Sequence, residues 1–320
     1  MASVKFKGKI VTHEDEDDRD ISAIVSFDDF LAIGSDESQG KIQVLHKTDS
    51  HYQVKDKLEI ELPVDPENED QEIDIEGMSI NDDNILYIIG SHSLKRSKVK
   101  ADKTYKKNRK RITKIIVEER KNNIFKLKLD PKTGKVKDQA QSKIIPLKKI
   151  IENDPILKRF TAIPSKENGI DIEGIATDGN ILYLGFRGPV LRLNYVPVMV
   201  IEDSDNLQYE LRFVDLRGNG IRDLIKVKDG FLIVAGAVGD ALSPYYLYFW
   251  NGVDCIPGTE KPQESQLTLL GEIPTPERGK AEGITLMEET ASWYKVMVVY
   301  DGLPQGSPKL LQVIKPGLLT

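Results

Sequence analysis

The sequence predicts an all-β fold, a β-propeller of five four-stranded blades. The phrase Asp-Ile-Glu-Gly occurs at residues 74–77 and again at 171–174, and a shorter form, Ala-Glu-Gly-Ile, occurs at 281–284. The two full copies are each followed by a polar turn and a short apolar run, a pattern typical of a β-hairpin. A strand that repeats with a carboxylate at one place indicates that its copies surround a common axis, as the innermost strands of a propeller do.

Two fainter copies complete the ring. Residues 20–24 are followed by the apolar run 30–34, and residues 220–224 by the run 231–235. The position of the glutamate, called here the slot, is therefore occupied in chain order by Ser22, Glu76, Glu173, Arg222 and Glu282. Only the interval from Glu76 to Glu173 is long enough for a further blade, and it contains a lysine-rich segment that reads as an insertion. Five blades account for every strand, and six is the alternative.

The remaining apolar stretches predict the outer strands. They lie at 41–47 and 52–62 in the first blade, 123–129 and 135–146 in the second, 190–201 and 208–216 in the third, and 245–250 and 267–273 in the fourth. The last hairpin contributes strands at 296–300 and 310–314, and we expect residues 4–11 to supply the fourth strand of that blade. Joining both termini in one blade closes the ring and removes an open sheet edge. A short helical piece is expected at about 146–153.

Composition limits the possible classes of protein. The 320 residues show no break in composition, so a single domain over 1–320 is expected. The net charge of −6 argues against a duplex-binding surface, and the single cysteine, Cys255, excludes an internal disulfide and a CxxC zinc site. No apolar run is long enough to cross a bilayer and no signal core is visible, so we expect a cytoplasmic protein without a membrane partner.

The insertion, at about 94–114, is the main anomaly of charge. Lysine and arginine dominate it from Lys95 to Lys114. Because runs of like charge are usually solvated, we expect an exposed insertion. The alternative is an arm that meets a nucleic acid or an acidic protein, although the scarcity of aromatic residues argues against single-strand binding.

Polar residues at the ends of the second strands predict a site. The loops after these strands should form the mouth of the axial channel, above the slot residues. The expected funnel residues are Ser22, Asp36, Glu76, His92, Glu173, Arg187, Arg222, Glu282 and Asp301. Clustered carboxylates raise one another's pKa unless cations intervene. The arginines could latch the blades together, or bind carboxylate or phosphate groups of a ligand.

A hard metal ion could instead balance the negative charge of the carboxylates. Oxygen-rich sites suit Ca²⁺ or Mg²⁺, and the expected ligands are Asp36, Glu76, Glu173 and Glu282.

These motifs, taken in order, resemble a bacterial family catalogued as domain of unknown function 3616. The resemblance covers about residues 20–302 and is carried by both Asp-Ile-Glu-Gly phrases, Gly-Ser-His-Ser at 90–93, Asn108-Arg109, and the segments 185–192, 220–224, 280–284 and 298–301. It adds Arg109 to the expected ligand-binding residues. The Glu-Gly repeats are also similar to those of propellers called esterase-like or phytase-like. The sequence departs from the family pattern in its lysine-rich insertion and in Phe186, where leucine is more usual.

Three functions fit these observations. The first is binding of a small polar or anionic ligand in the funnel, with or without a divalent cation. The second is metal-assisted hydrolysis of phosphate or carboxylate esters, with Glu76, Glu173 and His92 as catalytic residues. The third is a rigid platform that meets a partner through the lysine-rich arm. We favour ligand binding because no complete nucleophile, base and oxyanion set is visible.

Overall fold

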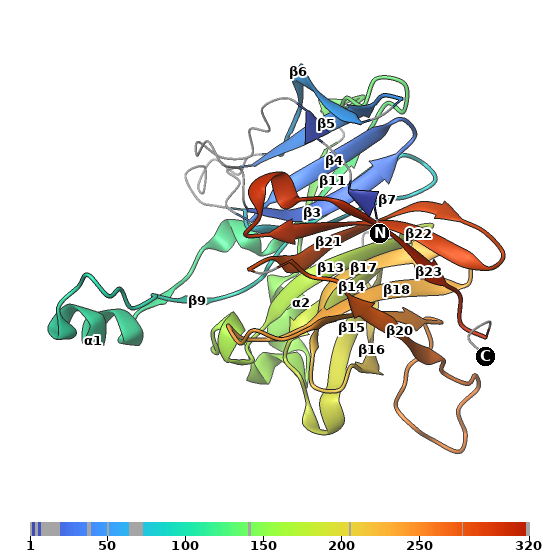
Figure 1. Ribbon diagram of the computed structural model, residues 1–320. Helices are drawn as coiled ribbons and strands as arrows, with labels where there is room; N and C mark the ends of the chain where they lie inside the picture. The colour runs from blue at the N-terminus through green and yellow to red at the C-terminus, as the bar shows by residue number, and fades with distance from the viewer. Residues whose placement is uncertain are drawn as a thin grey trace.

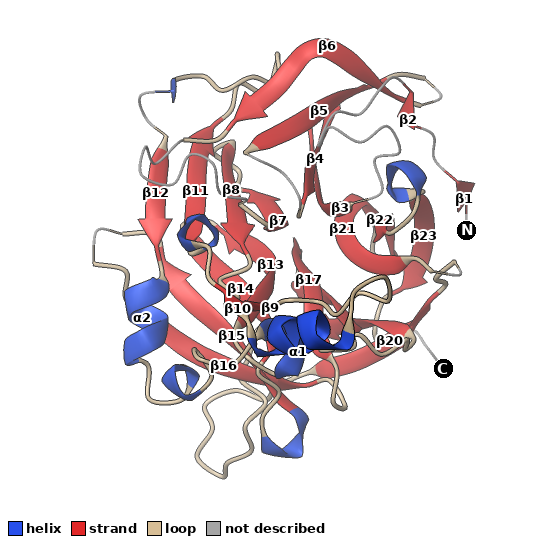
Figure 2. Cartoon of the chain, turned by 90° about the vertical axis from the view of Figure 1, so that its left-hand side faces the viewer, coloured by secondary structure: helices blue, strands red, loops and turns tan. Residues whose placement is uncertain are grey.

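The protein is a five-bladed β-propeller, which confirms the fold class predicted from the sequence. The computed structural model describes residues 2–3, 6–7, 20–36, 40–49, 51–63, 73–139, 142–204, 206–276 and 278–317. Five antiparallel sheets of at least four strands each radiate from one axis. Figure 2 looks along this axis, and Figure 1 shows the same ring from the side.

Each blade runs from the axis outward. Blade 1 consists of β3 (Ile21–Phe27), β4 (Phe30–Ser35), β5 (Lys41–Lys47) and β6 (Tyr52–Glu61). Blade 2 consists of β7 (Ile75–Ile80), β8 (Ile85–Gly90), β11 (Asn123–Lys128) and β12 (Lys143–Pro146). Blade 3 consists of β13 (Asp171–Asp178), β14 (Ile181–Gly188), β15 (Tyr195–Glu202) and β16 (Tyr209–Asp215).

The two remaining blades follow the same plan. Blade 4 consists of β17 (Gly220–Val227), β18 (Gly230–Gly236), β19 (Tyr245–Trp250) and β20 (Leu267–Ile273). Blade 5 consists of β21 (Lys280–Glu289), β22 (Trp293–Asp301), β23 (Lys309–Ile314) and β1 (Ala2–Ser3). The inner strands β3, β7, β13, β17 and β21 contact one another in this order, and β21 contacts β3, so the ring is closed.

The second strands of blades 1 and 4, β4 and β18, are apolar on both faces because a neighbouring blade covers each face. Every residue of β4 and of β18 is buried. Aromatic rings fill the wedge between blades 3 and 4, where Tyr183 and Phe231 have ring centroids 4.3 Å apart and Trp250 is fully buried. Burial of such rings supplies much of the hydrophobic stabilisation of blade-to-blade contacts.

The two termini of the described chain meet in blade 5, as predicted, but through a different segment. Ala2 pairs with Leu310 and Ser3 with Lys309, so β1 is the fourth strand. In the range predicted for that strand, 4–11, the structure describes only β2 (Phe6–Lys7), and β2 pairs in parallel with β6 of blade 1. The other residues of that range lie outside the described part of the chain.

Two other strands are shorter than predicted. β12 starts at Lys143 rather than 135, because the turn after Asp130 extends the connection and leaves only the isolated bridge of Leu129 with Val136. β15 starts at Tyr195 because a 3₁₀ turn, η6 (Arg192–Asn194), precedes it. The predicted helical piece is α2 (Lys148–Asn153). The remaining 3₁₀ turns are η2 (Glu119–Lys121), η4 (Leu157–Arg159), η5 (Ser165–Glu167) and η7 (Pro304–Gly306).

The lysine-rich segment forms an arm, defined here as residues 95–114. It contains β9 (Lys95–Arg96) and α1 (Tyr105–Thr113), and β10 (Ile115–Ile116), which follows it, pairs with β9. Figure 1 shows α1 well away from the blades, on one side of the ring, and Figure 2 views the ring from that side. Within the described residues no helix has the length and apolar character needed to cross a membrane.

Candidate functional site

The slot residue of every blade lies at a β-bulge. In blade 2, Ile75 pairs with Gly90 and Gly77 with Ile89, so Glu76 is the extra residue on its strand. The same interruption of the register occurs at the other four slot residues, Ser22, Glu173, Arg222 and Glu282. A bulge bends its strand and re-aims a side chain. Because the bulge recurs in all five blades, the ring has one defined position per blade for a polar side chain.

The glycine after each slot glutamate lets the inner strands approach one another. A Cβ on Gly77 would lie 3.0 Å from the carbonyl oxygen of Glu173 in the next blade. A Cβ on Gly174 would lie 2.9 Å from the backbone nitrogen of Leu224. In each Glu-Gly pair, the glutamate places a charge at the bulge, and the glycine leaves room for the inner strand of the neighbouring blade. This explains why the two residues repeat together.

A polar cavity of about 670 Å³ opens at the end of the ring from which the arm emerges. We call it the funnel. Its wall contains nine carboxylates. Asp36, Asp74, Glu76, Asp171, Glu173, Glu282 and Asp301 belong to the ring, and Glu167 and Asp240 lie at its edge. Basic side chains in the wall include Arg187 from the ring, Lys280 and Lys166 at its edge, and Lys95, Arg96 and Lys98 from the root of the arm. The funnel is therefore a strongly charged site with an excess of acid near its axis.

Two buried arginines form ion pairs with some of these carboxylates. Arg187 pairs with Asp171, and its Nη1 lies 2.5 Å from Glu173 Oε1. Arg222 Nε lies 2.9 Å from Glu173 Oε2, and its Nη2 pairs with Glu282. These five side chains form one continuous network across blades 3, 4 and 5, called here the latch. The latch agrees with the structural role considered for the arginines.

Asp74 is compensated separately. Its carboxylate lies 3.1 Å from Lys121 Nζ and 3.2 Å from Lys95 Nζ, and it accepts a 2.5 Å hydrogen bond from Ser91 Oγ. Burial favours a raised pKa for Asp74, but the two ammonium groups and the hydroxyl outweigh it, and the pKa is lowered. Asp74 is therefore a charged carboxylate that ties the root of the arm to blade 2.

Glu76 differs from these groups, since no cation among the described residues pairs with it. Its pKa is raised well above the ordinary value, first by burial and then by the charges of Glu173, Asp74 and Asp171. Burial, aided by Asp74 and Asp301, also raises the pKa of Asp36 to about 8. Burial and Glu173 raise that of Asp171 to about 7 against the opposing effect of Arg187. Without a cation, the funnel therefore favours the protonated forms of Glu76 and Asp36, and a bound cation would favour their ionised forms.

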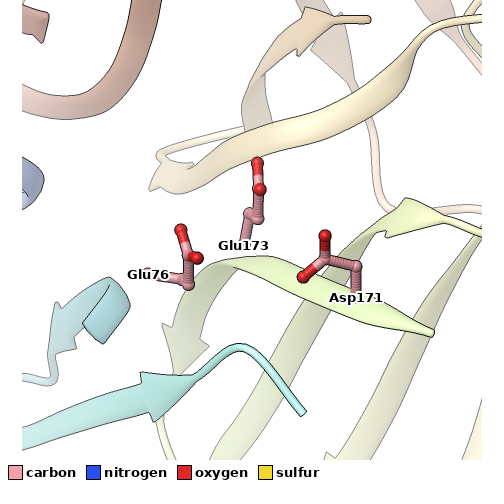
Figure 3. A group of neighbouring side chains, drawn as sticks. All are labelled: Glu76, Asp171 and Glu173. Atoms are coloured by element: carbon pink, nitrogen blue, oxygen red, sulfur yellow. The ribbon is translucent and has the colours of Figure 1, made fainter. Parts of the chain in front are cut away.

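Three of these carboxylates form a group that could hold a metal ion. Glu76, Asp171 and Glu173 each offer an oxygen within 4.8 Å of the others (Figure 3). Together with Glu282 they bring four carboxyl groups to the two latch guanidiniums, and ionising all four leaves an excess of two negative charges. One divalent cation would balance that excess, and carboxylate oxygen is the donor that Ca²⁺ and Mg²⁺ prefer.

This group differs from the predicted metal ligands. Glu76 and Glu173 belong to it, but Asp171 takes the place expected for Asp36 and Glu282. Glu282 is held by Arg222, and Asp36 lines the funnel outside the group. Asp171 and Asp74 were not predicted as site residues, although both open the repeated phrase Asp-Ile-Glu-Gly. The repeat contained the signal, because a residue two positions before the bulge recurs as faithfully as the slot itself.

The structure brings most of the predicted funnel residues together. Those in the wall are Asp36, Glu76, Glu173, Arg187, Glu282 and Asp301, and Arg222 is joined to two of them through the latch. Ser22 differs from the prediction, since its side chain is 1% exposed and its hydroxyl donates a 2.5 Å hydrogen bond to the carbonyl of Ile75. A short side chain at the bulge binds the neighbouring strand and does not reach the funnel.

His92 and Arg109 also lie elsewhere. His92 lines a separate cavity of about 60 Å³ beside α2, and its Nδ1–H donates to the carbonyl of Gly90 at 2.7 Å. Its Nε2 is buried without a hydrogen-bond partner, and burial lowers its pKa to about 4. Arg109 is exposed on α1, because the insertion carries it away from the ring. Neither side chain is part of the funnel wall.

These features define a class of protein, a five-bladed β-propeller with an acidic funnel on its axis. The chain belongs to the family described as "Protein of unknown function (DUF3616)", whose model matches residues 20–309. The resemblance inferred from the sequence is thereby confirmed. No curated protein matches the chain.

The solved structures that match the chain are distant from it in sequence. Hydrazine synthase of Kuenenia stuttgartiensis has a TM-score of 0.39 and 13% identity, over 95% of this chain and 69% of that one. Sqt1 of Saccharomyces cerevisiae has a TM-score of 0.34 and 7% identity, over 98% and 99% of the two chains. The N-terminal domain of Nup159 has a TM-score of 0.33 and 10% identity, over 92% and 75%.

Proposed function

We propose that the funnel binds a divalent cation, Ca²⁺ or Mg²⁺, and through it a small polar or anionic ligand. One observation carries the proposal. Glu76 has no partner cation in the described chain and lies with Asp171 and Glu173 in a group whose oxygens are within 4.8 Å of one another. Bringing several carboxylates together without compensation is costly, and a bound cation removes that cost.

The charge of the funnel determines the order of binding. Arg187 and Arg222 are the arginines expected to hold an anion, but each already pairs with two carboxylates. An anion that entered without a cation would therefore meet a net negative site. A bound cation reverses this local field and offers open coordination positions, since Mg²⁺ and Ca²⁺ keep water or ligand oxygens in their shells. Ligand binding should consequently require the cation.

Ester hydrolysis remains the second candidate. A cation in this funnel could lower the pKa of a bound water and so supply a nucleophile. The base expected for that reaction, His92, lines a different cavity, which is why binding without turnover is preferred.

Calorimetric titration with CaCl₂ and MgCl₂ tests the cation. Wild-type protein should bind one equivalent, and Glu76→Gln should weaken binding roughly tenfold or more because a single carboxylate ligand is lost, about 1.4 kcal/mol per factor of ten. The substitution keeps the side-chain shape and breaks no ion pair recorded for Glu76. Glu264→Gln, an exposed change in the connection between β19 and β20, is the control. Equal affinities for Glu76→Gln and wild type, or no binding by either, would overturn the proposal.

The ligand step has its own readout. Inorganic phosphate should raise the thermal midpoint only in the presence of the cation, because the cation supplies the positive charge. At a hundred times its dissociation constant, a ligand that binds only the folded state adds about 2.7 kcal/mol to stability. Stabilisation by phosphate in the presence of a chelator would contradict the order of binding.

A further inference from the structure

We infer that the ligand of the funnel is a phosphate-bearing polyanion, which the lysine-rich arm captures and leads to the cation site. The inference rests on the proposed function for the funnel but is carried by different residues. The arm contains eleven lysine and arginine residues and one acidic residue, Asp102, for a net charge of +10. The whole chain has −6, so the rest of the chain carries −16. Positive charge is thus concentrated in one short projecting element.

The arm maintains its shape through its own contacts. Asn108 accepts a hydrogen bond from the backbone nitrogen of Lys100 at 3.0 Å and donates to its carbonyl at 2.8 Å. Arg111 donates to the carbonyl of Lys98, and Arg96 donates to the carbonyl of Ile112 at 2.7 Å. α1 nevertheless buries none of its side chains. The arm is therefore an ordered element whose outer surface is available to a partner.

Most of the basic side chains of the arm are not used in these contacts. Arg96 pairs with Glu167 and Lys103 with Asp102. No carboxylate of the described residues pairs with the following six, all of them exposed: Lys100, Lys106, Lys107, Arg109, Lys110 and Lys114. Five of the six are lysines, which act as hydrated point charges, whereas arginine offers a planar fork. Such a set suits attraction to a chain of repeated negative charges more than recognition of one planar carboxylate.

The helix sorts these charges onto one side. At about 100° per residue, Lys106, Lys107 and Lys110 fall within roughly a third of the circumference of α1. Asn108 and Ile112 lie on the other side, where Asn108 binds Lys100 and Ile112 lines the funnel. The lysine face is consequently turned away from the root of the arm, toward solvent.

The root of the arm connects this face to the site. Lys95 and Lys98 line the funnel together with Glu76 and Glu173, and Lys166 and Lys280 line the same cavity. Basic groups therefore extend from α1 to the cavity that contains the carboxylate group. Lys95, Lys166 and Lys280 pair with Asp74, Asp240 and Asp301. Lys98, with which no carboxylate of the described residues pairs, therefore carries the positive charge of α1 on to the rim of a site that attracts anions only when its cation is bound.

The acidic body does not cancel this attraction. The screening length at physiological ionic strength is about 8 Å, and Figure 1 shows α1 standing apart from the blades. Phosphate is the preferred anion because Mg²⁺ is commonly held by one or two carboxylates together with substrate phosphates. The phosphate could belong to inorganic polyphosphate or to a nucleic acid, which share this chemistry.

Fluorescence anisotropy with three probes tests the inference. The probes are inorganic polyphosphate, a single-stranded oligonucleotide and a poly-glutamate peptide, each with about twenty charges, measured from 50 to 300 mM KCl with Mg²⁺ or with chelator. Affinity for at least one phosphate probe should fall steeply with salt. The triple variant Lys106→Gln/Lys107→Gln/Lys110→Gln should reduce the slope of log affinity against log salt by about 2, since each single-strand contact contributes roughly 0.7.

A matched triple variant controls for loss of charge alone. Lys132→Gln/Lys135→Gln/Lys137→Gln removes three exposed lysines from the connection between β11 and β12, and should bind like wild type. Glu76→Gln should keep the salt-dependent capture but lose the additional affinity that Mg²⁺ confers. The phosphate probe that gains more from Mg²⁺ identifies the source of the phosphate.

Two results would overturn the inference. Cation binding by calorimetry without binding of either phosphate probe would remove it and leave the proposed function of the funnel intact. Equal binding of poly-glutamate and both phosphate probes, unchanged by Mg²⁺, would replace it with an acidic protein as partner of the arm. Loss of cation binding as well would contradict the proposed function itself.

Discussion

At the scale of single residues, pairing separates the structural groups of the funnel from those available to a ligand. Arg187 and Arg222 are buried, and each is bound to two carboxylates. Arg222 joins blade 4 to blades 3 and 5 through Glu173 and Glu282, whereas Arg187 pairs with Asp171 and Glu173 of its own blade. Glu76 lies beside them without a partner cation in the described chain. In the sequence, the arginines and Glu76 looked equivalent, as charged groups near one axis. They differ in role because the arginines have carboxylate partners, whereas Glu76 has no partner cation in the described chain.

The latch should be important for stability. Arg222→Met keeps the length of the side chain but leaves Glu173 and Glu282 without this cation, and removal of one partner from a buried ion pair typically costs about 3–5 kcal/mol. Urea denaturation should show a loss of that order. Arg192→Met, on the exposed turn η6, should change stability by less than about 0.5 kcal/mol. A latch variant as stable as the control would mean that Arg187 compensates Glu173, and Lys280 compensates Glu282, without Arg222.

His92 should make the fold sensitive to acid. Its pKa in the folded protein is about 4, below the ordinary 6.5, because burial disfavours the charged form of the ring. As pH falls from 6.5 to 4, the unfolded chain binds a proton that the folded chain does not, so stability is lost in that window and is fully present above it. The pKa difference corresponds to about 3 kcal/mol.

Urea denaturation between pH 4 and 8 measures this effect as a difference from His92→Gln. The stability difference, wild type minus variant, should be constant above pH 7 and fall by about 3 kcal/mol toward pH 4. A flat difference for His92→Gln would show that folding leaves the pKa of His92 unchanged.

At the scale of elements, the repeat in the sequence was enough to predict the blades, but it did not predict which way the side chains of the inner strands point. The Glu-Gly phrase predicted the inner strands because its glycine permits the close approach of neighbouring blades. The bulge that aims the slot residue could not be predicted, since the register shift depends on the partner strand. Ser22 illustrates the limit, because it has the same place in the repeat but bonds to Ile75.

Residues on connections were harder still to predict. Asp171 and Asp74 both open the repeated phrase, so the repeat itself indicated Asp171 as a site residue. His92 and Arg109 follow strands or lie in an insertion, where no periodic pattern constrains the path of the chain. The arm was predicted as an exposed basic insertion, but neither its short helix nor its position at the mouth of the funnel followed from charge alone.

The close approach of inner strands gives a prediction for blades 3 and 4. A methyl group on Gly174 would lie 2.9 Å from both the nitrogen and the Cβ of Leu224, so Gly174→Ala must displace backbone. Such overpacking typically costs about 1–3 kcal/mol, and the thermal midpoint should fall by several degrees. Gly258→Ala, where no atom lies within 4 Å of the added group, is the matched control. An unchanged midpoint for Gly174→Ala would show that the blades can separate without cost.

At the scale of the whole molecule, few residues of the N-terminal segment cover the outer edge of blade 5 and join it to blade 1. Two residue pairs join β1 to β23, and two more join β2 to β6 in the adjacent blade. Phe6 is 6% exposed, so this short segment also buries an aromatic ring. The inner strands would form a ring without it, but the outer edge of β23 would then be an unpaired strand. The N-terminal segment therefore protects the edge of β23 as well as adding contact area.

Deleting residues 1–7 should expose that edge. The backbone groups of residues 309–310 would lose their partners, and loss of a few hydrogen bonds and the ring of Phe6 should lower stability by roughly 1–3 kcal/mol. Hydrogen exchange should accelerate at residues 309–310 and leave β20, the outer strand of blade 4, unchanged. An exposed edge also pairs with other chains, so light scattering should rise with protein concentration. Deletion of residues 318–320 should do neither, and unchanged exchange in β23 after the N-terminal deletion would show that β1 contributes nothing to closure.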